Sequence, residues 1–121
     1  MRRHRALLAV LVLAAVAGGW AAAEVPEGVK ALVGSRCAGC HKGKMPPAGL
    51  NLEPANLAAI VDAPSRQAPP AKIVDRTAPE TSYLLKKVRR EAGIAGRPMP
   101  PGKALTAEEL GLLEAWVAGL K

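Results

Sequence analysis

One stretch of the sequence combines the side chains needed to attach a metal-containing cofactor. Residues 37–41 read Cys-Ala-Gly-Cys-His, which is the attachment pattern of c-type haem. Two intervening residues bring the thiols of Cys37 and Cys40 to the separation of the two haem vinyl groups. The next residue places the His41 imidazole under the iron. The motif therefore predicts one covalently bound haem c per chain, with His41 as an axial ligand.

Other uses of a Cys-x-x-Cys pair fit this chain less well. A thioredoxin-like pair needs a preceding strand and a βαβ context, whereas a helix is expected before Cys37 and no sheet is predicted. A zinc site needs about four ligands, and beyond residue 23 the chain has two cysteines and one histidine, so only carboxylates could complete it. A structural disulfide needs no histidine, and a disulfide or redox pair is the alternative to haem attachment.

The second axial ligand must come from a short list, because the only other histidine, His4, lies in the N-terminal segment. The sixth position of the iron must then hold methionine, lysine, another weak ligand, water or no ligand. Met45 follows His41 by four residues, which span at most roughly 14 Å, too little to round the macrocycle to its other face. Met99 lies 58 residues from His41, with prolines on both sides. We predict that Met99 is the sixth ligand and that its thioether raises the reduction potential.

The first 23 residues have the composition of a secretory signal peptide. Arginines precede an apolar run, and the alanines at 21–23 supply a small-x-small cleavage pattern. We expect cleavage after Ala23, which leaves 24–121 as one domain in the periplasm or another extracytoplasmic space. An uncleaved anchor formed by 6–23 is the alternative, because this run of 18 residues is near the lower length limit of a spanning helix.

Charge and aromatic content limit the classes of partner. The whole chain is formally +7, and without the three signal-peptide arginines it has 14 basic and 10 acidic residues, hence +4. A mildly basic surface favours acidic partners, but no aromatic residues are interleaved for nucleic acid. The chain has no Phe, so a large apolar cofactor would help to fill a small core. No catalytic acid, base or nucleophile is evident, so we predict no enzyme activity of its own.

The hydrophobic pattern predicts an all-α fold with about four helices and proline-rich loops. The expected helices cover 26–36, 54–62, the segment from Thr77 to about residue 91, and the segment from Thr106 to the C-terminus. Thr77 and Thr106 each begin a capping-box pattern, with glutamate three residues later.

Four basic residues crowd the end of the helix expected after Thr77. They are Lys86, Lys87, Arg89 and Arg90. We interpret them as compensation of the helix dipole and a solvated face, and a docking patch for a redox partner is the alternative.

Over most of 25–120 these features resemble a monohaem class I cytochrome c. The stretches GLNL at 49–52, PETSYLLKKV at 79–88 and MPPGKALTAEELGLLEAWV at 99–117 are similar to compact cytochrome c modules, which occur alone or joined to larger enzymes. The resemblance implies an electron carrier that shuttles single electrons between exported redox proteins with acidic docking surfaces. A haem-based ligand-binding or sensory domain, and a cytochrome subunit of a larger exported oxidoreductase, are the alternatives.

The resemblance also implies structural roles around the haem. The first and last helices should cross, with Trp116 near the haem or the crossing. A backbone carbonyl after the motif should accept the His41 Nδ1 hydrogen. We expect the Met-Pro-Pro stretch at 45–47 to shape the loop that leaves the haem and to offer such a carbonyl. The residues expected to form pocket walls are Leu50, Leu52, Tyr83 and Leu84.

Overall fold

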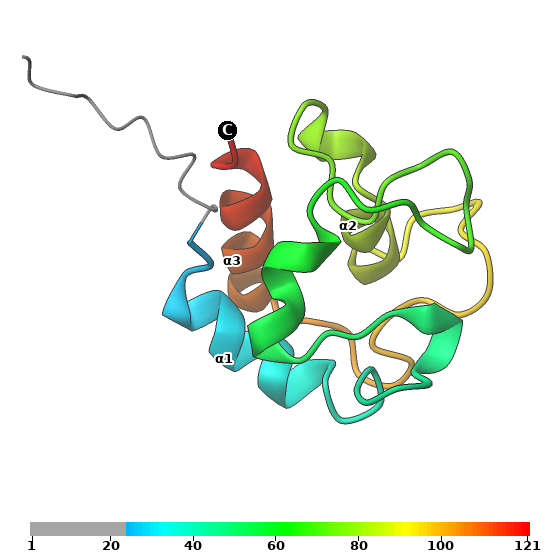
Figure 1. Cartoon of the computed structure of the whole chain (residues 1–121), viewed down its shortest axis with the longest axis horizontal. Coiled ribbons are helices and arrows are strands. Elements are labelled where there is room, and N and C mark those ends of the chain that lie inside the picture. Colours follow the sequence, from blue (N-terminus) through cyan, green and yellow to red (C-terminus); the bar gives the residue numbers. More distant parts are fainter. Residues whose placement is uncertain (1–23) are drawn as a thin grey trace, which may run out of the picture.

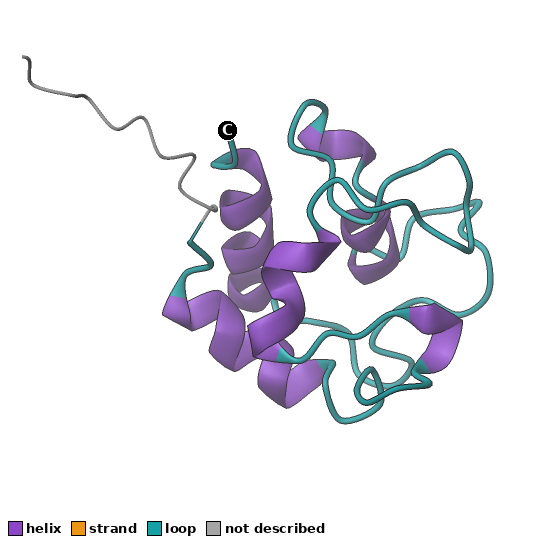
Figure 2. Ribbon diagram, viewed as in Figure 1, coloured by secondary structure: helices purple, strands orange, loops and turns teal. Residues whose placement is uncertain are grey.

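The computed structural model describes residues 24–121, which form three α-helices (Figures 1 and 2). Short 3₁₀ helices lie between the first and second of them. In chain order the elements are α1 (Glu27–Arg36), η1 (Pro47–Gly49), η2 (Pro54–Ile60), η3 (Pro79–Thr81), α2 (Tyr83–Val88) and α3 (Ala107–Ala118). The predicted all-α class is confirmed, because the described residues form no strand.

Two isolated bridges are the nearest approach to β structure within 24–121. Val61 pairs with Val74, and Pro64 pairs with Lys72. None of the helices within 24–121 combines the length and the hydrophobicity of a membrane span. The predicted signal peptide, residues 1–23, lies outside the described residues.

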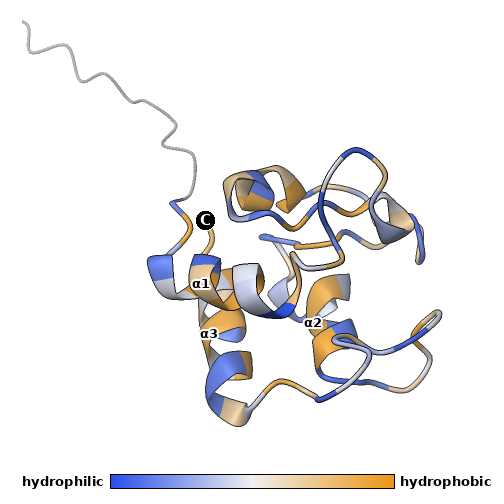
Figure 3. Cartoon of the chain, turned by 90° about the horizontal axis from the view of Figure 1, so that it is seen from below, coloured by the Kyte–Doolittle hydropathy of each residue, from blue (hydrophilic) through white to orange (hydrophobic). Residues whose placement is uncertain are grey.

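The first and last helices pack against each other and form one side of the core (Figure 1). Each helix has both apolar and polar residues along it, so one face of each can be buried (Figure 3). The buried side chains of α1 are Val29, Leu32 and Val33, and those of α3 are Leu113, Trp116 and Val117. Burial of such side chains is the main source of stability.

The segment between α1 and α2 completes the core. Leu57 of η2 and Val74 are fully buried, and Leu85 of α2 is almost so. Arg36 at the end of α1 donates to the carbonyls of Lys103 and Ala104 at 2.8 and 3.0 Å. The end of α1 is therefore tied to the chain that enters α3.

The predicted capping box at Thr106 is confirmed. The Thr106 hydroxyl accepts from the Glu109 amide at 3.1 Å, and the Glu109 carboxylate accepts from the Thr106 amide at 2.9 Å. The two residues thus satisfy amides that the first turn of α3 leaves without intrahelical partners. Helix α3 ends at Ala118, just short of the C-terminus.

The predicted capping box at Thr77 is wrong, and so is the long helix expected after it. Thr77 donates its hydroxyl to Asp75 Oδ1 at 2.8 Å, and Asp75 also accepts from the amides of Thr77 and Ala78. This carboxylate organises a turn, in which Asp75 has taken the role expected of Thr77. The short helix η3 follows, and α2 begins only at Tyr83.

The helix predicted over 54–62 is also corrected. The segment is the 3₁₀ helix η2, which ends at Ile60. Asp62 has a positive φ of 59°, which a right-handed helix does not allow. Its amide donates to the Val74 carbonyl at 2.7 Å, so a tertiary hydrogen bond replaces the next helical one.

We expect Thr106→Ala to lower the free energy of unfolding by about 1 kcal/mol, because it removes the hydroxyl acceptor of a complete capping box. Thr77→Ala is the matched control, and it should cost less, since the Thr77 hydroxyl caps no helix and makes only an exposed hydrogen bond to Asp75. Denaturant unfolding of both variants measures the difference. Equal losses would show that the Thr106 box does not stabilise α3.

Candidate functional site

One cavity of about 560 Å³ gathers the residues predicted to bind haem. Cys37, Cys40 and His41 line it from the segment after α1, and Met99 lines it from the loop between α2 and α3. This volume lies within the roughly 300–1,000 Å³ typical of ligand pockets. Side chains far apart in the sequence therefore face one cavity.

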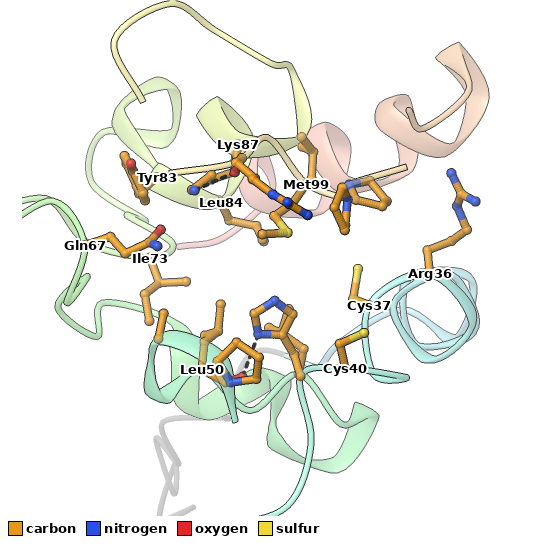
Figure 4. A pocket seen from close by; sticks show the side chains of 18 of the residues that line it. Arg36, Cys37, Cys40, Leu50, Gln67, Ile73, Tyr83, Leu84, Lys87 and Met99 are labelled. Atoms are coloured by element: carbon orange, nitrogen blue, oxygen red, sulfur yellow. Dashed lines mark hydrogen bonds between the residues drawn. The ribbon is translucent and has the colours of Figure 1, made fainter. Parts of the chain in front are cut away.

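Met99 lies across the cavity from the segment that follows the Cys-x-x-Cys-His motif. In Figure 4, Met99 and Leu84 are on one side, and Leu50 and Cys40 are on the other. His41 belongs to the Leu50 side, because its Nδ1 is hydrogen-bonded to the Leu50 carbonyl at 3.0 Å. The imidazole and the thioether are thus contributed by opposite walls.

Met45 takes no part in this cavity. Its side chain is 95% exposed and lies beside a separate, smaller pocket that Lys44 and Arg66 also line. The structure therefore separates the two Met-Pro-Pro stretches, since only Met99 faces the space that His41 lines.

The hydrogen bond to Leu50 fixes the tautomer of His41. A carbonyl can only accept, so Nδ1 must carry the hydrogen and Nε2 keeps its lone pair. The ring is buried, and the His41 carbonyl accepts from the Leu52 amide at 2.8 Å. Such a contact orients an imidazole for metal binding through Nε2.

The acceptor for His41 is Leu50 and not a proline of the 45–47 stretch. The carbonyls of Pro46 and Pro47 instead accept from the amides of Gly49 and Leu50 at 3.0 and 3.1 Å. These bonds close the turn that presents the Leu50 carbonyl. Gly49 has a φ of +66°, a left-handed conformation that favours glycine.

Both cysteines of the motif are free thiols, with Cys37 partly buried and Cys40 exposed. Burial raises the pKa of Cys37 to about 11, against the lowering effect of the Arg36 charge. The Cys37 thiol is therefore neutral at physiological pH. Within 24–121, no three His, Cys, Asp or Glu side chains gather in a way that could hold a metal ion.

All four residues expected to form pocket walls line the cavity: Leu50, Leu52, Tyr83 and Leu84. The sequence analysis did not single out Ile73 and Val88, which also line it. Ile73 lies in the short stretch 71–75, which reads Ala-Lys-Ile-Val-Asp. Because this stretch forms only isolated bridges, the sequence pattern gave no sign of the direction in which Ile73 faces.

The loop that carries Met99 is held by the side chains of α2. Lys87 Nζ donates to the carbonyls of Ala95 and Arg97, the second at 2.7 Å. The Tyr83 hydroxyl accepts from the Ala95 amide at 2.7 Å, and the Lys87 carbonyl accepts from the Met99 amide at 3.1 Å. These bonds fix the main chain from Ala95 to Met99.

The interpretation of the basic cluster at the end of α2 as a solvated face is wrong for Lys87, whereas Arg90 is exposed. Lys87 is only 6% exposed, and its burial lowers its pKa. Arg89 pairs with Glu80 and Glu114 at 2.8 and 2.9 Å. Arg90 donates to the carbonyls of Pro100 and Gly102 at 2.8 and 2.7 Å. The sequence shows the charges but not the carbonyls that they meet.

Comparison of the chain with protein-family models, with curated proteins and with solved structures finds no match in any of the three. The functional argument therefore depends on the geometry of the cavity and the chemistry of its side chains.

We expect Arg90→Gln to loosen the loop that carries Met99. Two charge-assisted hydrogen bonds would be lost, so exchange of the Met99 amide should accelerate by roughly tenfold. Hydrogen exchange followed by NMR measures this rate. Arg97→Gln is the control, because Arg97 is exposed in the same loop and its guanidinium makes no hydrogen bond within 24–121. An unchanged rate in the Arg90 variant would contradict the role of Arg90.

Proposed function

We propose that this protein is a one-electron carrier with one covalently bound haem c. A single observation carries the proposal: Cys37, Cys40, His41 and Met99 line the same cavity. The two thiols and the oriented imidazole come from one segment, and the thioether comes from the opposite wall (Figure 4). This is the donor set of a c-type haem with His and Met as axial ligands.

The cavity residues suit a large, flat and mainly apolar group. Leucine, isoleucine, valine and proline side chains make up much of the wall, and such surfaces gain free energy when they are covered. The His41 Nε2 lone pair is free for a metal, since Nδ1 is engaged by Leu50. When bound, the haem iron would accept and release single electrons.

Each proposed ligand has a distinct task. The thiols of Cys37 and Cys40 would each add across one vinyl group, with the sulfur bonding to one carbon and the hydrogen to the other. His41, held by the Leu50 carbonyl, would bind one face of the iron. Met99, held through its amide by Lys87, would bind the other face, where a soft thioether favours reduced iron.

The surroundings of the site support electron transfer over chemistry on a substrate. With both axial positions filled by protein side chains, a substrate would have no open position on the iron. The aliphatic walls would exclude water, which limits the reorganisation that accompanies a change of charge. The net charge of +4 for residues 24–121 supports acidic redox partners, and the N-terminal sequence supports an extracytoplasmic location.

Covalent attachment is the first test of this function. After co-expression with haem-attachment machinery, the denatured chain should retain the haem, and the native protein should show a c-type α band in the reduced-minus-oxidised spectrum. Cys37→Ser combined with Cys40→Ser is the control and should release the haem on denaturation. An apoprotein with two intact thiols would contradict the proposal.

The two methionines give a second, matched test. Reduced Met99→Leu protein should bind carbon monoxide rapidly, because the sixth position opens. The oxidised form of the same variant should lack the methionine-to-iron charge-transfer band. Met45→Leu should behave as the unsubstituted protein, since Met45 is exposed outside the cavity. Stopped-flow mixing of each reduced variant with carbon monoxide measures the binding rate, and the optical spectrum of each oxidised variant shows whether the band is present. The reverse result would assign the ligand to Met45, and rapid binding by the unsubstituted protein would favour a sensory domain.

A further inference from the structure

Lys87 is a buried cation without a carboxylate partner among residues 24–121. Its ammonium donates to the carbonyls of Ala95 and Arg97, and no Asp or Glu lies within ion-pair distance. Its neighbour Arg89, by contrast, has two carboxylate partners. An ammonium has three N–H donors, so one is left. Buried charges are normally paired, which points to an anion that is not part of the described chain.

The cavity that Lys87 lines contains cations and no carboxylate. Arg36, Arg66, Lys87 and Arg97 contribute to its wall, and no Asp or Glu does. Arg36 is engaged by Glu109 and by two carbonyls near the start of α3. The other three have no carboxylate partner in the described part of the chain. A ligand with negative groups would therefore be favoured here.

The polar group formed by Lys87 and Gln67 lies at the edge of the cavity away from the thiols. A Cβ built on Gly96 would stand 3.5 Å from Gln67 Nε2 and 3.6 Å from Lys87 Nζ, so the two polar ends converge over Gly96. Figure 4 shows Gln67 and Cys40 on opposite sides of the cavity. Haem carries its vinyl groups on one edge and its two carboxylates on the opposite edge. Thiols bonded at the vinyl edge would turn the carboxylates toward Gln67 and Lys87.

We propose that Lys87 and Gln67 bind a carboxylate of the haem, with Lys87 as its counter-ion and Gln67 as a neutral hydrogen-bond donor. This inference rests on the proposed function. The same ammonium holds the Ala95 and Arg97 carbonyls, so one side chain joins the carboxylate to the loop that carries Met99. The haem would thereby help to order the loop that supplies its own axial ligand.

A thermodynamic cycle that combines one substitution with one change of ligand separates carboxylate binding from the structural role of Lys87. The probes are iron mesoporphyrin, which has ethyl groups in place of vinyl groups and so binds reversibly, and its dimethyl ester, which lacks the carboxylates. Titration of the apoprotein gives a Kd for each probe with the unsubstituted chain and with Lys87→Met. Lys86→Met is the matched control, because Lys86 is adjacent on α2 and does not line the cavity.

We expect Lys87→Met to weaken binding of the diacid by roughly tenfold more than binding of the ester, as expected for a charge-assisted hydrogen bond. Damage to the Met99 loop would weaken binding of both probes equally, so its effect cancels when the two Kd ratios are compared. Lys86→Met should leave the ratio unchanged. Equal weakening of diacid and ester by Lys87→Met would overturn the inference and leave the proposed function standing. Failure of the unsubstituted chain to bind either porphyrin would overturn both.

Discussion

The position of Met99 depends on hydrogen bonds to a loop without a helix or strand of its own, made by α2 and by Arg90 just beyond its end. Lys87 and Arg90 each donate to two carbonyls of this loop, and Tyr83 accepts from one of its amides. Prolines beside Met99 remove main-chain donors, so side-chain donors from Lys87 and Arg90 to the loop carbonyls are an effective way to hold the loop. The cost of burying Lys87 is offset only if its ammonium is well bonded. Lys87, Arg90 and Tyr83 thus hold this wall of the cavity together.

The opposite wall is built by local interactions. The turn at 46–50 closes through the carbonyls of Pro46 and Pro47, and it presents the Leu50 carbonyl to His41. Few residues separate the imidazole from its acceptor, so this wall needs little help from distant parts of the chain. The two walls meet because α1 and α3 pack together, and because Arg36 ties the end of α1 to the segment after the Met99 loop. The core therefore sets the separation across which the two proposed ligands face each other.

The sequence predicts structure well where the stabilising interactions are local, and poorly where they join residues farther apart in the chain. The helix α1 and the Thr106 capping box depend on residues within a few positions of one another, and both were predicted. The helix expected after Thr77 was wrong because Asp75 takes over the amides near Thr77, and local pattern does not show which acceptor will prevail. The prediction of a solvated Lys87 is wrong because the carbonyls that it bonds lie 8 and 10 residues away, in a loop without periodicity. The proposed ligands could be named from residue type and spacing, but the side chains that hold them could not.

The central claim is that Met99, and not Met45, faces His41 across a bound haem. The NMR spectrum of the reduced protein labelled with ¹³C at its methionine methyl groups tests this claim in one measurement. A methyl group bound over the face of a porphyrin is shifted strongly to high field by the ring current. The account predicts one such methyl, assigned to Met99, with the Met45 methyl at the position of an exposed side chain. A high-field methyl assigned to Met45, or no shifted methyl at all, would contradict it.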